Sequence, residues 1–192
     1  DEADEPCRDL ACPSCHLPVP RAVLESRPPI FLSIIGRPAA GKSVFLAAML
    51  HRLRASLPQV FQVGITEPHA PSNGLIHYYE DIMFGAANKE SHVKLPKTPE
   101  VQEDDLAVND PFRLYRRVRY GDMERDYPRP MFFQLSPLAA HPHGGDAARF
   151  TRTLCLYDNA GEHFEAQSTN QIITQHMAHS SGLFFVFDPV QE

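Results

Sequence analysis

The chain alternates between short runs of consecutive apolar residues and longer stretches in which apolar residues recur at helical spacing. Residues 28–35, PPIFLSII, form a nearly continuous apolar run, which is typical of a strand buried on both faces of a parallel sheet. Apolar side chains then recur at helical spacing from Phe45 to Leu57, and Pro58 is expected to close this helix. The pattern predicts a buried strand followed directly by an amphipathic helix.

The middle of the chain has weaker patterns. Residues 72–87, SNGLIHYYEDIMFGAA, place apolar side chains on one face of a predicted helix, with Ser72 or Asn73 as its candidate cap. Residues 88–111 are polar and interrupted by prolines, which predicts a loop. Two further strands are expected on either side of a turn. They are FRLYRRVRYGD, residues 112–122, and RPMFFQLSPL, residues 129–138, around GDMERDYPRP, residues 121–130.

Strand and helix patterns return in the last third of the chain. TLCLYD, residues 153–158, is a predicted strand, residues 165–179 a predicted helix, and GLFFVFD, residues 182–188, a second buried strand. Strands and helices that alternate in this way indicate an α/β fold, with a mostly parallel sheet in a three-layer sandwich.

The segment IGRPAAGKS, residues 35–43, joins the first strand to the first helix and fits G-x-x-x-x-G-K-[ST]. In such a P-loop, backbone N–H groups at a helix N-terminus point at phosphates. Lys42 is expected to reach the terminal phosphates, and the Ser43 hydroxyl to ligate Mg²⁺. The alternative is a glycine-rich turn that binds nothing. The predicted nucleotide-binding residues in this loop are Gly36, Arg37, Pro38, Ala39, Ala40, Gly41, Lys42, Ser43 and Val44.

A partner for the loop follows the strand at residues 153–158. Asp158 ends this strand, so in a parallel sheet it can face the P-loop and hold Mg²⁺. Three residues later, the Gly161 amide could sense a γ-phosphate and move when that group leaves.

The motifs GKS, LPKT, LYDNAGEHF and FVFDPVQ together resemble the bacterial double-GTPase family, which is often found in conflict-system operons. DNAGE resembles the D-x-A-G-[Q] switch II signature of Ras-like GTPases. The resemblance covers residues 30–192. It implies a P-loop NTPase fold that binds GTP and Mg²⁺, hydrolyses GTP slowly and acts as a molecular switch with a protein partner encoded nearby.

The resemblance also implies two further catalytic residues. Glu162 occupies the position of the water-orienting Gln of Ras-like proteins and could position or polarise the attacking water. The alternatives are a surface or capping glutamate, or His163 in the same role. Thr98, in KLPKTPE, is the expected switch I ligand of Mg²⁺, with Thr66 as its competitor.

The choice of nucleotide stays open from the residues alone, because the guanine-recognition motif N-K-x-D does not occur in the chain. A P-loop ATPase with Glu162 as catalytic base, or a nucleotide-binding assembly module without hydrolysis, would fit the same residues. We expect the chain to be a fragment, truncated after the strand that follows switch II. Its GTPase-like part would span residues 28–192, with an insertion at residues 66–129.

Residues 1–27 are polar and form the expected second unit. Cys7, Cys12 and Cys15 are close together, and C-P-x-C is a knuckle that presents two thiolates to Zn²⁺. His16 is the candidate fourth ligand, although a residue from outside the chain would serve equally, and free thiols are the alternative.

Composition narrows the function classes further. The chain has 192 residues, a net charge of −6 and a pI of about 5.9, which argues against non-specific nucleic-acid binding. No apolar run approaches the roughly 20 residues of a membrane-spanning helix, and no signal peptide is visible. A cytoplasmic location is therefore expected.

Overall fold

The computed structural model describes residues 10–11, 19–25, 28–85, 95, 115–120, 123–159, 161 and 175–189. Its centre is a five-stranded sheet in the order β2-β5-β6-β1-β7. The strands are β1 Ile30–Ile35, β2 Val63–Thr66, β5 Met131–Pro137, β6 Arg152–Asp158 and β7 Gly182–Phe185. β1 pairs in parallel with β6 and β7, whereas β5 pairs antiparallel with β6 and β2. Every strand of this sheet except β5 therefore runs in the same direction, which confirms the predicted α/β class with a mostly parallel sheet.

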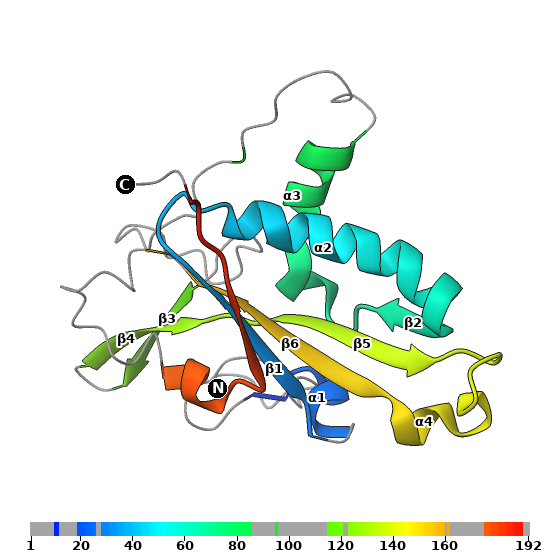
Figure 1. The fold of residues 1–192 in the computed structure, drawn as a ribbon. Coiled ribbons are helices and arrows are strands. Elements are labelled where there is room, and N and C mark those ends of the chain that lie inside the picture. Colours follow the sequence, from blue (N-terminus) through cyan, green and yellow to red (C-terminus); the bar gives the residue numbers. More distant parts are fainter. Residues whose placement is uncertain are drawn as a thin grey trace.

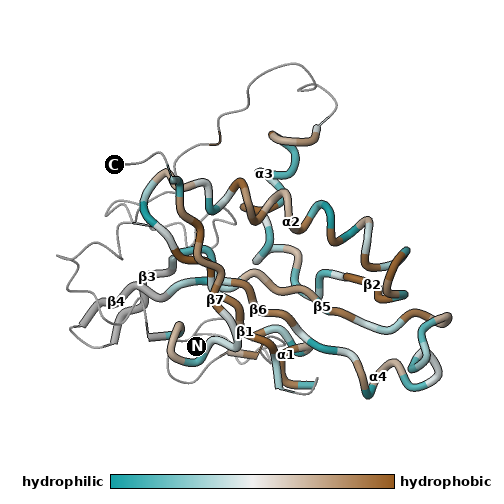
Figure 2. The backbone as a smooth tube through the Cα atoms, viewed as in Figure 1, coloured by the Kyte–Doolittle hydropathy of each residue, from teal (hydrophilic) through white to brown (hydrophobic). Residues whose placement is uncertain are grey.

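Helices lie on both faces of the sheet (Figure 1). The helices α2, Lys42–Ser56, and α3, Gly74–Phe84, cover one face, whereas the short helix α1, Arg21–Glu25, lies on the other. The core forms between the sheet and α2 and α3, and Figure 2 shows apolar residues along β1 and β6. Its most deeply buried apolar side chains are Ile34, Leu46, Ala47, Leu50, Ile76, Tyr79, Phe133 and Leu156.

The helical path continues slightly beyond the predicted end of α2. α2 ends at Ser56, and the π-helical turn η1, Leu57–Phe61, follows it and contains Pro58. The proline is the second residue of η1, and its missing N–H coincides with the change from α-helical to π-helical structure. The remaining short elements are η2 Ala70–Asn73, η4 Gly144–Asp146, α4 Ala147–Phe150 and η6 Gln175–His179.

Asn73 precedes α3, as predicted, but its side chain does not cap the helix. The side chain is buried and pairs with the backbone of Phe132 in β5 instead. Asn73 Nδ2 donates to the Phe132 carbonyl at 2.9 Å, and the Phe132 N–H donates to Asn73 Oδ1 at 2.9 Å. The predicted cap residue therefore joins the start of α3 to β5 of the sheet.

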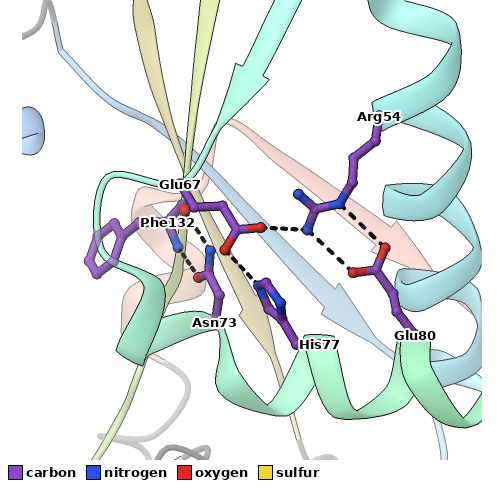
Figure 3. A network of polar contacts seen from close by, with 6 residues as sticks. All are labelled: Arg54, Glu67, Asn73, His77, Glu80 and Phe132. Atoms are coloured by element: carbon purple, nitrogen blue, oxygen red, sulfur yellow. Dashed lines mark hydrogen bonds and ion pairs between the residues drawn. The ribbon is translucent and has the colours of Figure 1, made fainter.

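A polar network ties α2 to β2 and α3 (Figure 3). Arg54 Nη2 lies 2.6 Å from Glu67 Oε1 and 3.3 Å from Glu80 Oε2, and His77 Nε2 lies 2.6 Å from Glu67 Oε2. Burial raises the pKa of Glu67, but hydrogen bonds from Asn73, His77 and Arg54 outweigh it and lower the pKa overall. Arg54 is therefore the cation that pairs with both mostly buried carboxylates, Glu67 and Glu80.

Replacing Arg54 with methionine is expected to destabilise the fold by about 1–3 kcal/mol, because two carboxylates would lose their cation. The lowered pKa of Glu67 means that its contribution is present above the ordinary carboxylate range and is lost as the pH falls. Urea unfolding at pH 7 and pH 3 measures both effects. Arg52→Met, at an exposed position of the same helix, is the control; equal unfolding midpoints for the two variants would contradict the assigned role.

The prediction that residues 112–122 and 129–138 form two strands around a turn at residues 121–130 is wrong. A separate two-stranded sheet forms between β3, Tyr115–Tyr120, and β4, Met123–Pro128, with Tyr115 opposite Pro128. Most of the expected turn is therefore a strand, and β5 joins the main sheet instead. Charged residues and a proline make MERDYP resemble a turn, although a strand at the edge of a two-stranded sheet tolerates the same residues.

The final strand is also different from the prediction of a buried element. β7 lies at the edge of the sheet and alternates between half-buried and exposed residues. Phe184 packs against Phe45 of α2 with ring centroids 5.8 Å apart, whereas Leu183, Phe185 and Phe187 are exposed. Of the helix predicted at residues 165–179, the described part is the 3₁₀ turn η6. Most of the loop predicted at residues 88–111 lies outside the described residues.

Candidate functional site

The P-loop segment and Asp158 meet where parallel strands end. The register sets Ile34 of β1 opposite Asp158 of β6, and Ile35 opposite Phe185 of β7. The chain leaves β1 immediately afterwards, at Gly36, and returns as α2 at Lys42. Because ligands of open α/β sheets bind outside the carboxyl ends of strands, this edge is the candidate site.

The backbone of the loop has unusual φ angles at Gly36 and Ala39. Gly36 has φ 153°, and a Cβ at this position would lie 2.1 Å from the Val186 carbonyl oxygen, so only glycine fits. Ala39 has φ 61°, which is uncommon for a residue with a side chain and costs free energy. Strain of this kind accumulates at binding loops, which supports a ligand-binding role for Gly36–Ser43.

Lys42 is held inside the curve of this loop. Its side chain is buried, and Nζ donates to the carbonyl oxygens of Gly36 at 3.0 Å and Arg37 at 2.9 Å. These bonds fix an ammonium group at the first turn of a 15-residue helix whose N-cap, Gly41, offers no side-chain hydrogen bond. The helix N-terminus and the ammonium group together create a positive potential suited to an anion.

Ser43 and Asp158 join the loop to β6. Ser43 Oγ donates to Asp158 Oδ2 at 2.9 Å, and Asp158 is 3% exposed. Burial raises the pKa of Asp158 to about 6, although the Ser43 hydrogen bond and the Lys42 charge act in the opposite direction. Within the described residues, Asp158 Oδ1 has no hydrogen-bond partner. Buried carboxylates with a raised pKa are typical of functional sites, which makes Asp158 a candidate site residue.

Asp158→Asn is therefore expected to stabilise the ligand-free protein at pH 7.5. The shift of about two pKa units corresponds to about 3 kcal/mol, or a rise in Tm of roughly 6–12 °C. The folded-state pKa lies above the unfolded one, so protonated Asp158 stabilises the fold below about pH 4, and this stabilisation is lost as the pH rises through about 6.

The stability advantage of Asp158→Asn over the parent should consequently disappear below about pH 4, where the parent carboxyl is already neutral. Thermal unfolding of Asp158→Asn and the parent across pH 4–8 tests this, with the exposed Asp81→Asn as the control. A lower Tm for Asp158→Asn at pH 7.5 would show that the buried charge is satisfied in the free protein.

Gly161 lies directly against the Gly36–Ser43 loop. A Cβ on this residue would lie 2.3 Å from the Pro38 nitrogen and 2.6 Å from the Arg37 carbonyl carbon. Only glycine lets the two backbones approach this closely. A movement of the loop backbone at Arg37 or Pro38 would therefore displace Gly161.

The structure brings together the predicted loop, Asp158 and Gly161. Thr66 does not join them, because it ends β2, and β5 and β6 lie between β2 and β1. The other predicted site residues lie outside the described part of the chain. They are Cys7, Cys12, Cys15, His16, Thr98, Glu162 and His163.

Asn159 is a buried site residue that sequence reasoning missed. Its side-chain Nδ2 donates to the Ile34 carbonyl at 3.0 Å and so links the ends of β6 and β1. No local sequence signal could have found it, because its partner Ile34 lies 125 residues away in the chain.

The described residues contain no group of three or more His, Cys, Asp or Glu side chains that could hold a metal ion. Among the helices in the described ranges, none is both long and apolar enough to cross a membrane. Comparison of the chain with protein-family models, with curated proteins and with solved structures found no match. The function must therefore be inferred from the residues and geometry of the site.

Proposed function

We propose that the chain forms the P-loop NTPase part of a nucleotide-dependent switch that binds GTP with Mg²⁺ and hydrolyses it slowly. The observation that carries this proposal is the 2.9 Å hydrogen bond between Ser43 and Asp158. It joins residues 115 positions apart, one at the start of α2 and one at the end of the neighbouring strand β6. A glycine-rich turn without a ligand would have no need of a buried carboxylate beside its lysine.

Ser43 and Asp158 are the residues that would hold Mg²⁺. Hydroxyl and carboxylate oxygens suit this ion, and Asp158 Oδ1, which has no hydrogen-bond partner within the described residues, supports the fit. When bound, the ion would help to neutralise the negative charge of the β- and γ-phosphates. Burial raises the pKa of Asp158, and a bound cation would act in the opposite direction by favouring the charged carboxylate.

The residues of the chain would act on the nucleotide through charge and orientation. The Lys42 ammonium group, fixed by two loop carbonyls, would bind the terminal phosphates. The Gly161 N–H would contact the γ-phosphate from the segment that lies against Arg37 and Pro38. Glu162, the next residue in the chain, would orient the attacking water and accept its proton.

Guanine is proposed over adenine because DNAGE resembles a switch II signature, and the position of β6 beside β1 agrees with that reading. Release of inorganic phosphate from GTP and from ATP, measured in parallel on the 192-residue chain, tests the choice. Slow release from GTP alone supports the proposal, and we expect a protein partner to accelerate it. Release from ATP alone would favour the ATPase alternative, and binding without release would favour an assembly module.

A zinc site in residues 1–27 is a separate part of the proposal. We expect about one zinc ion per chain, and Cys12→Ser should lose it because a structural site needs its thiolate ligands. Cys155→Ala is the matched control, since Cys155 is buried and burial raises its pKa to about 12. Metal analysis of freshly purified protein measures the zinc content; zinc-free parent protein would leave the cysteines as free thiols.

A further inference from the structure

Asn159 lies where β1 and β6 separate. Ile34 and Asp158 are the last registered pair of these strands, after which β1 enters the phosphate loop and β6 leads to Gly161. The Asn159 side chain is 1% exposed, and its bond to the Ile34 carbonyl adds one more link beyond the last registered pair. This side-chain bond therefore joins the two strands at the point where they diverge.

Asn73 shows what a buried asparagine with a purely structural role looks like in this protein. Both polar atoms of Asn73 are hydrogen-bonded to the Phe132 backbone. Asn159 bonds through Nδ2, whereas its Oδ1 is buried with no hydrogen-bond partner in the ranges that the structure describes. An unsatisfied buried oxygen costs at least as much as one neutral hydrogen bond contributes. Among the described residues, Asn159 therefore makes only one of the two side-chain bonds that Asn73 makes.

We infer that Asn159 is a positioning residue: its amide holds the end of β6 against β1 and thereby keeps the Asp158 carboxylate at the Ser43 hydroxyl. This inference rests on the proposed function, in which the same two oxygens hold Mg²⁺. Asp158 and Asn159 are consecutive, so fixing one side chain to β1 restricts the backbone that carries the other. Partners that orient a metal ligand typically change metal affinity by about 10–100-fold when they are removed.

The test compares nucleotide affinity with and without Mg²⁺ in the full 192-residue chain. The probe is a fluorescent, non-hydrolysable GTP analogue, titrated in MgCl₂ and in EDTA. The variants are Asn159→Ala and Asn159→Leu; leucine keeps the branched shape of the side chain but replaces the hydrogen-bonding amide with methyl groups. Asn73→Ala is the matched control, because it also removes a buried asparagine bonded to a strand but lies at α3. Thermal unfolding confirms which variants are folded.

In the parent and in Asn73→Ala, Mg²⁺ should tighten binding by the same factor. In the Asn159 variants that factor should fall about 10–100-fold, with affinity in EDTA little changed. If Asn159→Ala fails to fold, Asn159→Leu carries the comparison. Unchanged Mg²⁺ dependence in a folded Asn159 variant would overturn the inference while the parent still binds nucleotide. A parent that binds no nucleotide would overturn the proposed function, and the inference with it.

Discussion

Lys42→Ala is expected to lower the affinity for GTP about 10²–10⁴-fold. The change removes an ammonium group that the Gly36 and Arg37 carbonyls hold in the phosphate loop. Two charge-assisted hydrogen bonds to phosphate contribute about 1.5–3 kcal/mol each, and each 1.4 kcal/mol changes affinity about tenfold. Fluorescence titration with a GTP analogue in the presence of Mg²⁺ measures the loss.

The matched control for this prediction is Arg52→Ala, which removes the same charge from an exposed position of α2. It separates a direct contact from a change in overall potential, because exposed charges more than about a Debye length away are largely screened. Equal affinities for Lys42→Ala and Arg52→Ala would contradict the P-loop assignment.

Glu162→Ala is expected to slow GTP hydrolysis about 10²–10⁴-fold with little change in nucleotide affinity. A group that acts only on the attacking water contributes to the transition state and not to ground-state binding. The position of Gly161 against Arg37 and Pro38 brings the chain to the loop one residue before Glu162. Phosphate release under single-turnover conditions, together with the titration above, separates the two quantities.

Glu25→Ala, at an exposed position of α1, is the control for that assay. Hydrolysis by Glu162→Ala at the parent rate would make Glu162 a surface or capping residue. Loss of affinity and turnover together would instead indicate a role in binding. Asp158→Asn should weaken Mg²⁺-dependent binding and raise stability, whereas Glu162→Ala should lower turnover and leave affinity unchanged, so the two variants can be distinguished.

The sequence predicted the elements that pack directly against the core. β1 and β6 are apolar runs, α3 carries apolar residues on one face, and α2 follows directly from the glycine loop. The glycine loop was also predictable, because the Gly36 conformation excludes every other residue. The meeting of this loop with Asp158 followed from the rule that parallel strands end at one edge.

Features that depend on partners far away in the chain were not predictable. β4 pairs with β3 in a separate hairpin, so its residues need no apolar face and resemble a turn. β7 has an apolar sequence that fits a buried strand, yet its place at the sheet edge exposes Leu183 and Phe185. Asn73 and Asn159 found backbone partners in strands far from them in sequence, where local rules predict only caps and turns.

The most direct test of a Mg²⁺-dependent triphosphate site formed by the Gly36–Ser43 loop and Asp158 is calorimetric titration of the parent chain with GTP. The account predicts saturable binding of about one GTP per chain, tighter in MgCl₂ than in EDTA, because Ser43 and Asp158 would hold an ion that helps to neutralise the phosphate charge. Asp158→Asn, although more stable, should lose this Mg²⁺ dependence. Absence of heat with GTP and Mg²⁺, in protein that unfolds cooperatively on heating, would contradict the account.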